Sequence, residues 1–266
     1  MTFEPQSLGL RTELFIAARE GSVTAAEGCL VIRNPDNPQS WFGNSLVLPG
    51  SPRRGDLARW EAMHVAAHPD APHRVFQWDD VDGDVGDAGA FVEAGYELQP
   101  MEVMTTRSAV DNGKVDHGLD VRELTTDDAW EQKLALRMAI AVDSEGFTAE
   151  SYRGYAQAVH DFQRGLVADS VARWYGVFEG DRVLATLGLV DMGPLARFQR
   201  VETHPDARRR GLCSGLVWHV TTRALAERPD RTLVMLAVAD YHARLIYRSL
   251  GYVQTERRAT LCKRPD

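Results

Sequence analysis

Apolar positions in the second half of the chain follow two periods, which predict alternating strands and helices. Residues 174–178, 183–190 and 197–203 are short apolar-rich runs of strand composition. Leu212, Leu216, Val220 and Ala224 then recur at helical spacing until Pro229. Residues 233–238 are continuously apolar, as in a strand buried on both faces.

The flanking segments extend this pattern in both directions. Residues 119–124 alternate as a strand would, and Thr126 is a candidate N-cap for a helix that runs through Met138. A second helix is predicted over residues 149–169, and a last strand over residues 254–262. The predicted order is strand, two helices, three strands, helix, strand, helix, strand.

The first half has a similar but weaker pattern. Residues 28–32 and 41–48 read as strands on either side of an Asn-Pro-Asp-Asn-Pro turn, followed by a helix through 57–65 and a strand at 73–78. Residues 109–118 have turn composition and no apolar periodicity, which indicates a linker. A chain of 266 residues is long enough for two domains, so we expect one over 1–108 and another over 119–266.

The connection between the strand at 197–203 and the following helix has the composition of an anion site. Three consecutive arginines precede Gly211, which stands at the predicted helix start, where unpaired N–H groups and the helix dipole favour an anion. An isolated run of arginines is usually a solvated turn, but the order strand, proline, basic loop, glycine and helix suits phosphate. Nucleic acid is not the expected partner, because the net charge is -8 and no broad basic face is evident.

Two segments resemble the GNAT acetyltransferase family. Residues 208–213 are similar to its [Q/R]-x-x-G-x-[G/A] loop, with Cys213 in place of glycine or alanine. Residues 240–252 are similar to its N-x-x-A-x-x-x-Y-x-x-x-G-[F/Y] segment, with Asp240 in place of asparagine. One helix and one strand separate the two segments, as in that family.

The resemblance implies an α/β (α+β) protein with tandem GNAT folds, each a mixed, mostly antiparallel sheet flanked by helices. In the first half, Arg53-Arg54-Gly55 and residues 90–96 look like eroded copies of the two motifs. Asp56 would place a carboxylate against a pyrophosphate, and Phe91 stands in the tyrosine position. We therefore expect a degenerate first copy that binds little or no cofactor; the alternative is an unrelated α/β domain.

The implied co-substrate is acetyl-CoA. Its pyrophosphate would lie on the backbone N–H groups and arginines of the loop, and its thioester carbonyl would accept a bond from a strand N–H near Val201 to Thr203. The candidate cofactor-binding residues are Val201, Thr203, Arg208, Arg209, Arg210, Gly211, Leu212, Cys213, Ser214, Asp240, Ala243 and Tyr247.

Two residues are the candidate catalysts. Tyr247 stands at the family's tyrosine position and could protonate the departing CoA thiolate, although its alternative role is core packing. Glu202 could accept a proton from the incoming ammonium, although a surface salt bridge with one of the arginines is equally consistent with its position. His204 and Asp240 are reserve candidates for the base.

The acceptor is expected to be a primary amine of a small molecule, because Asp143 and Glu145 lie in the loop that binds the acceptor in this family. A protein N-terminus or lysine, a longer acyl group, and a non-catalytic sensor of acyl-CoA remain alternatives.

Composition limits other functions. Cys29, Cys213 and Cys262 are widely spaced, which predicts neither a disulfide framework nor a zinc site, and the bound phosphates would cover Cys213 as a nucleophile. The acidic run at 79–87 does not fit a calcium loop, so no metal is expected. Without a membrane-length apolar stretch or a signal sequence, we expect a cytoplasmic monomer or homodimer.

Overall fold

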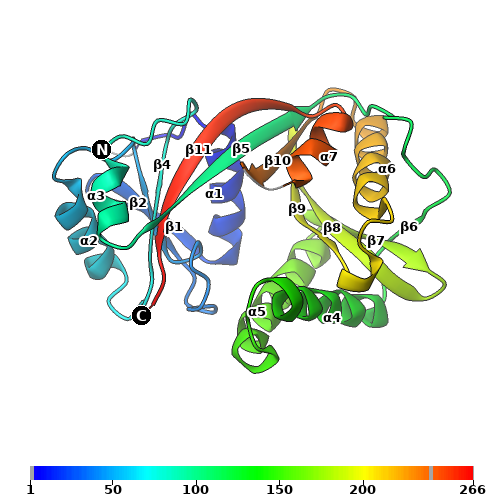
Figure 1. Ribbon diagram of the computed structural model, residues 1–266, viewed down its shortest axis with the longest axis horizontal. Coiled ribbons are helices and arrows are strands. Elements are labelled where there is room, and N and C mark those ends of the chain that lie inside the picture. Colours follow the sequence, from blue (N-terminus) through cyan, green and yellow to red (C-terminus); the bar gives the residue numbers. More distant parts are fainter. Residues whose placement is uncertain (1–2, 240–241, 266) are drawn as a thin grey trace. The chain divides into compact units, whose positions relative to one another are not determined.

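The computed structural model describes residues 3–239 and 242–265, which divide into two compact units. The first unit comprises residues 1–104, 236–241 and 254–266, and the second comprises residues 105–235 and 242–253. Figure 1 labels their helices and strands. No helix in the described ranges is both long and apolar enough to cross a lipid bilayer.

The first unit has a sheet in the order β1-β2-β3-β4-β11-β5. Its elements are α1 (Leu8–Glu20), β1 (Ser22–Ala26), β2 (Cys29–Arg33), β3 (Ser45–Leu48), α2 (Asp56–Ala67), β4 (Arg74–Trp78), α3 (Ala88–Glu93), β5 (Glu97–Thr106) and β11 (Val253–Lys263). The pairs β1/β2, β2/β3 and β4/β11 are antiparallel, and β3/β4 is parallel.

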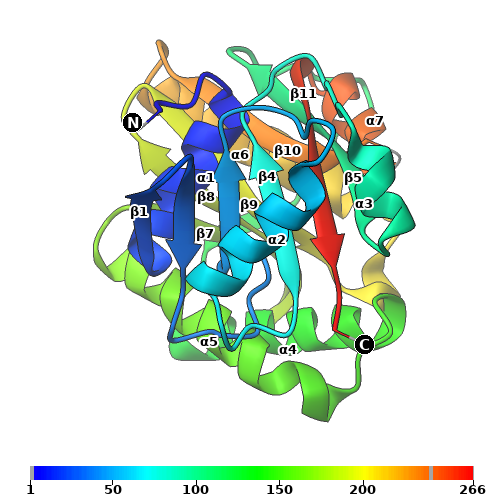
Figure 2. The ribbon, with the colours of Figure 1, turned by 90° about the vertical axis from the view of Figure 1, so that its left-hand side faces the viewer.

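Alternation along these strands supplies two apolar faces. Leu30, Ile32 and Val47 pack with Leu10 of α1, whereas Val31 and the neighbours of Val47 face the other way. On that second face, α2 lies across the sheet (Figure 2). Its core residues are Leu46, Leu48, Trp60, Phe76, Trp78, Phe91, Tyr96 and Leu261. A period of two along each strand therefore accounts for helices on both sides.

The second unit has the strand order β10-β9-β8-β7-β6. Its elements are β6 (Asp120–Glu123), α4 (Asp127–Ser144), α5 (Ala149–Ala168), β7 (Ala172–Glu179), β8 (Arg182–Met192), β9 (Leu195–Thr203), the short helix η1 (Pro205–Ala207), α6 (Leu212–Glu227), β10 (Thr232–Val238) and α7 (Ala243–Ser249). The pairs β6/β7, β7/β8 and β8/β9 are antiparallel, and β9/β10 is parallel.

Helices again cover both faces of this sheet. Trp174 of β7 packs against Trp130 of α4, with ring centroids 5.8 Å apart. Its neighbour Tyr175 faces the opposite side, where the Arg223 guanidinium of α6 lies 5.5 Å from its ring. Thr126 caps α4 as predicted, since its hydroxyl accepts a bond from the Ala129 amide at 3.2 Å.

The same succession of elements occurs in both units, which confirms the tandem fold. In each, a strand is joined to a parallel neighbour by one helix, through β3–α2–β4 in the first unit and β9–α6–β10 in the second. A short helix and a long strand follow each time, α3–β5 and α7–β11. Residues 8–20 and 22–26, to which the sequence pattern assigned no element, form α1 and β1.

The compact units differ from the predicted domain boundaries at the C-terminal strand. The predicted second domain runs to residue 266, but residues 254–266 group with the first unit. The reason is pairing: β11 lies antiparallel to β4, with Leu261 opposite Phe76 and Thr260 opposite Gln77. The predicted linker at 109–118 contains neither helix nor strand.

We expect Leu261→Ala to lower the free energy of unfolding by about 2–5 kcal/mol, because the side chain is fully buried against Phe76 and Trp78 and its loss leaves a cavity. Urea unfolding monitored by tryptophan fluorescence measures this change. Val253→Ala on the same strand is the control: Val253 is 60% exposed, so its truncation should change the value by less than about 0.5 kcal/mol. Equal effects of the two substitutions would contradict the assignment of β11 to this core.

Candidate active site

The loop between β9 and α6 has the backbone of an anion cradle. Gly211 is the N-cap of α6, has a φ of 76°, and makes no side-chain cap. Among the described residues, the backbone amides of 211–214 donate to no acceptor, and no atom lies within 4 Å of a Cβ built on Gly211. Free amides at this position indicate a site for an anion, because the helix dipole adds positive potential at the same end of α6.

The three loop arginines differ in their partners. Arg208 pairs with Asp143 at 2.8 Å and also donates to the Ser144 hydroxyl at 2.9 Å. Arg210 pairs with Glu179 at 2.7 Å. These exposed pairs are weak, on the order of 1 kcal/mol or less, so either arginine can exchange its partner for a phosphate. Within residues 3–239 and 242–265, the side chain of Arg209 has no ion pair or hydrogen bond.

Cys213 follows in the first turn of α6. Burial raises the pKa of its thiol to about 11, so the group is protonated at neutral pH. This opposes the lower pKa that a helix N-terminus and nearby arginines would give. A protonated, largely covered thiol is no nucleophile, and the structure favours Cys213 as a small residue of the cradle.

A β-bulge interrupts β9 immediately before the loop. Arg200 and Val201 together lie opposite Leu187, because Gly188 pairs with Gln199 and Thr186 with Glu202. Arg200 has a φ of 48°, which is unusual for a residue with a side chain. The parallel pairing of β9 with β10 is confined to Leu195–Arg197, although β9 continues to Thr203. The bulge re-aims the segment that holds the predicted residues Val201, Glu202 and Thr203.

Glu202 lies in a buried ion pair that sequence analysis did not identify. Its Oε1 accepts a bond from Nη1 of Arg137 on α4 at 2.9 Å, and both side chains are more than nine-tenths buried. Arg137 also bonds to Glu145 in the loop after α4. The predicted alternative was a surface bridge to a loop arginine; the observed partner comes from a helix instead. Within the described chain, Glu202 Oε2 has no hydrogen-bond partner.

A second buried cation, Lys133, lies one turn before Arg137 on α4. Its Nζ donates to Gln163 of α5 and lies 5.8 Å from the ring centroids of both Trp130 and Trp174. Burial lowers the pKa of this amine to about 8. Charged residues at positions 133 and 137 within the apolar stripe of Trp130, Leu136 and Ile140 were the available sequence signal.

Arg200 lies on the same side of the sheet as these groups. It donates to the Tyr155 hydroxyl of α5 at 2.6 Å. Tyr155 and Glu202 hold the pKa of this guanidinium above its ordinary value. Tyr152, also on α5, lies against the same cluster, with its ring 5.2 Å from the Arg137 guanidinium.

The predicted acid, Tyr247, lies near the end of α7 and is 6% exposed. Its ring centroid is 6.3 Å from that of Tyr252, whose hydroxyl bonds to Thr221 at 2.8 Å. Ala243, predicted to contact the cofactor, is buried at the start of α7, and Asp240 lies outside the described residues. Packing and a proton-donor role are both compatible with this position of Tyr247.

Gly251 and His204 have local structural explanations. Gly251 has a φ of 92°, and a Cβ built there would lie 2.6 Å from Val110, so the motif's glycine is required by the turn after α7. The Nδ1 of His204 accepts a bond from the Asp206 amide at 3.3 Å, which caps η1. This role accounts for His204 without a catalytic function.

The predicted acceptor residues Asp143 and Glu145 are both committed to arginines. Asp143 pairs with Arg208, and Glu145 pairs with Arg137. The loop therefore connects the anion cradle to the buried cluster around Glu202. It offers less free negative charge to a cationic acceptor than the sequence indicated.

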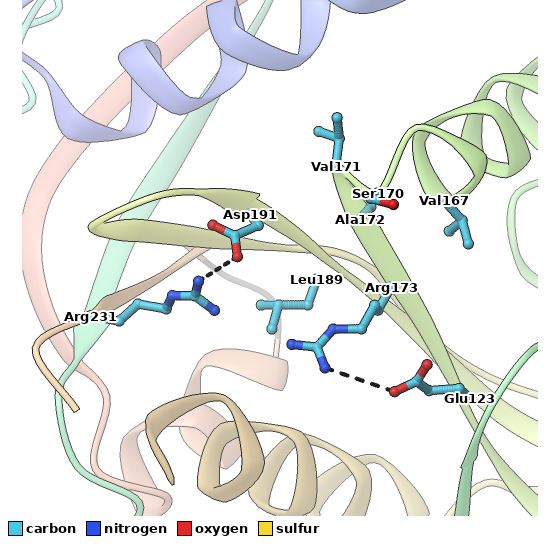
Figure 3. A pocket seen from close by; sticks show the side chains of 9 residues that line it. All are labelled: Glu123, Val167, Ser170, Val171, Ala172, Arg173, Leu189, Asp191 and Arg231. Carbon is cyan, nitrogen blue, oxygen red and sulfur yellow. Dashed lines mark hydrogen bonds and ion pairs between the residues drawn. The ribbon is translucent and has the colours of Figure 1, made fainter. Parts of the chain in front are cut away.

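A separate pocket of about 280 Å³ opens elsewhere on the second unit (Figure 3). Its charged residues lie in pairs: Arg231 with Asp191, and Arg173 with Glu123 at 3.8 Å. The remaining lining residues are Val167, Ser170, Val171, Ala172 and Leu189. None of the residues predicted to form the active site lines this pocket.

The first unit has an altered version of the cradle. Gly55 caps α2 with a φ of 89°, as Gly211 caps α6. However, the Asp56 carboxylate accepts a bond from the Arg53 amide at 2.9 Å and pairs with Arg59 at 2.8 Å. Phe91, in the tyrosine position, is fully buried in the core. The Asp56 carboxylate thus occupies a backbone N–H group, that of Arg53, which a bound anion could otherwise use.

The chain is similar to a known family in one segment and to known folds over nearly its whole length. Residues 174–261 match the family model described as FR47-like protein. A search of curated proteins gives no match. A functionally unknown conserved protein from Staphylococcus epidermidis ATCC 12228 is 12% identical, with a TM-score of 0.68 over 93% of this chain and 95% of that one.

Two similar structures have descriptive names. A GCN5-related N-acetyltransferase from Kribbella flavida is 16% identical, with a TM-score of 0.60 over 97% of this chain and 96% of that one. A tandem GNAT protein from the clavulanic acid biosynthesis pathway is 17% identical, with a TM-score of 0.51 over 82% and 77% of the two chains. Such low identities show a shared fold.

We expect Arg137→Met to lower the free energy of unfolding by about 3–5 kcal/mol, because it leaves the Glu202 carboxylate buried without its hydrogen-bonded ion-pair partner. The double variant Arg137→Met/Glu202→Met removes both charges and should recover most of that loss. Denaturant unfolding of the wild type, both single variants and the double variant forms the required cycle. Additive losses in the double variant would show that the two side chains are not coupled.

Proposed function

We propose that this chain, which belongs to the GNAT superfamily, transfers the acetyl group of acetyl-CoA to a primary amine of a small molecule. The observation that carries the proposal is the run of backbone amides at 211–214 that donate to no acceptor in the described chain, one short loop after the strand that holds Glu202. The proposed cofactor-binding loop and the candidate base, Glu202, thus belong to one continuous segment of the chain.

The cradle suits the pyrophosphate of CoA. Backbone donors and the N-terminal dipole of α6 supply directed positive potential, and Arg209 adds a charge that no internal carboxylate neutralises in the described chain. Gly211 keeps its outer face open to a ligand because it has no Cβ. Arg208 and Arg210 can also bind the pyrophosphate if they leave their exposed ion pairs with Asp143 and Glu179.

Transfer requires two proton movements. The Glu202 carboxylate, whose Oε2 is buried and has no partner in the described chain, takes a proton from the acceptor ammonium directly or through water and leaves a neutral amine. The amine nitrogen then forms a bond to the thioester carbonyl carbon, while a backbone N–H near Val201 to Thr203 stabilises the oxyanion. As the carbon–sulfur bond breaks, Tyr247 protonates the thiolate, and the nitrogen releases its second proton to solvent.

Arg137 acts on this chemistry through Glu202. Its bond to Oε1 fixes the orientation of the carboxylate. The first unit is proposed to bind no acetyl-CoA, because Asp56 already occupies the Arg53 amide and Phe91 has no proton to donate. One acetyl-transfer site per chain follows.

A non-catalytic acyl-CoA sensor is the rival from another class. Calorimetry with acetyl-CoA, followed by thiol-release assays over a panel of amines and peptides, separates the two. Binding with acceptor-dependent thiol release supports the transferase, and release with peptides alone supports a protein acetyltransferase. Binding without release from any acceptor supports the sensor.

We expect Gly211→Val to weaken acetyl-CoA binding by roughly 100-fold or more, because a branched side chain would obstruct the amides and strain a backbone with positive φ. Titration calorimetry measures the affinity. Gly55→Val is a matched control: that glycine has the same capping position and a φ of 89°, so the strain is similar, but binding should be retained. Normal binding by the Gly211 variant would overturn the cofactor assignment.

We expect Tyr247→Phe to lower kcat by roughly 100-fold or more while leaving acetyl-CoA affinity nearly unchanged, because the ring is kept and only the proton is lost. Steady-state thiol release measures kcat. Tyr252→Phe is the control, since its hydroxyl bonds internally to Thr221 and should not affect turnover. If both variants turn over like the wild type, Tyr247 is a packing residue.

A further inference from the structure

Buried positive charge exceeds buried negative charge on the face of β9 that α4 and α5 cover. The buried cations are Lys133 and Arg137, and Arg200 beside them is half-buried. Facing them are Glu202, which is buried, and Glu145, whose side chain is 38% exposed at the rim. Because buried charges in proteins are normally paired, this surplus indicates a further anion.

The three cations differ in how far their donors are used. Arg137 donates to both Glu202 and Glu145, which occupies its two terminal nitrogens. Lys133 donates to the Gln163 amide oxygen between two indole rings, deep in the core. Arg137 Nε and part of the Lys133 ammonium have no partner among the described residues, but both side chains are buried in the core, where they are poorly accessible to a ligand.

Arg200 is the exception. In the described part of the chain its guanidinium meets only the Tyr155 hydroxyl and forms no ion pair with a carboxylate. The bulge gives it a φ of 48°, a conformation that is strained in a residue with a side chain. Such strain at a bulge re-aims a side chain and is often found at functional sites.

The position of Arg200 relates it to the proposed base. It precedes Glu202 by two residues on β9, and both side chains contact the α4–α5 side, through Tyr155 and Arg137 respectively. A guanidinium fork matches the paired oxygens of a carboxylate or a phosphate. The loop carboxylate Glu145 is paired with the buried Arg137, so it offers no free counter-charge to a second ammonium group.

We propose that Arg200 binds an anionic group of the acceptor, so that the acceptor is a primary amine that also carries a carboxylate or a phosphate. This inference rests on the proposed acetyl transfer and narrows its substrate class. Glu202 receives the proton of the amine while Arg200 holds the anionic group, which orients the amine in the same site. Polyamines and neutral amines are then poor acceptors.

Acceptor pairs that differ only in the anionic group test the inference on the wild-type chain. Thiol release at saturating acetyl-CoA is measured for α-amino acids against their α-amides, and for ethanolamine phosphate against ethanolamine. We expect kcat/KM to be roughly 10- to 100-fold higher for the anionic member of at least one pair, as for charge-assisted hydrogen bonds. The two kinds of pair distinguish a carboxylate site from a phosphate site.

Arg200→Gln should remove this preference by raising KM for the anionic acceptor, while acetyl-CoA affinity by calorimetry stays the same. Arg153→Gln on α5 is the matched control, since that exposed arginine lies outside the cluster. A preference that survives Arg200→Gln, or neutral amines acetylated as well as anionic ones, overturns the inference and leaves acetyl transfer intact. Acetyl-CoA binding without thiol release from any acceptor overturns both.

Discussion

A glycine in the left-handed region begins the crossover helix in each half of this protein, and much of the architecture depends on that constraint. Gly55 and Gly211 both follow a basic dipeptide or tripeptide and both cap a helix without a side chain. Because no side chain satisfies the first amides, they must bond to something else. The two halves differ in the acceptor that is available to these backbone amides.

The buried pair of Arg137 and Glu202 connects this backbone feature to chemistry. Burying a carboxylate costs several kcal/mol unless a cation compensates for it, and Arg137 supplies that charge from α4. The same arginine reaches Glu145, in the loop whose Asp143 holds Arg208 of the cradle. A chain of ion pairs therefore joins the proposed base to the proposed phosphate site, which allows the contacts of one ligand to influence the other.

The sequence was sufficient for the fold because its signals are local. The periodicities of residues 212–227, the apolar run at 233–238 and the Thr126 cap all lie within their own elements and match α6, β10 and α4. The antiparallel partner of residues 254–262 is β4, which lies far away in the chain. Composition alone therefore could not assign that strand to the first unit. Long-range pairing is decided by packing, which a local pattern does not encode.

The site was less accessible from sequence for the same reason. The loop at 208–214 is contiguous and was found, but the partner of Glu202 is 65 residues away on α4. Arg200 looked like an ordinary strand residue, because a bulge leaves no mark in a single sequence. The surplus of buried charge becomes visible only when α4, α5 and β9 are brought together.

The two halves show how one residue can close an anion site without changing the fold. Position 56 is the first residue of α2 and is aspartate; the equivalent first residue of α6 is Leu212. An aspartate there accepts a bond from the Arg53 amide and gains from the helix dipole, so one backbone donor of the first unit is used internally. A leucine instead packs into the core and accepts nothing, which leaves the amides of the second unit for an external phosphate. The proposed loss of acetyl-CoA binding in the first unit and its proposed retention in the second therefore require no difference in backbone.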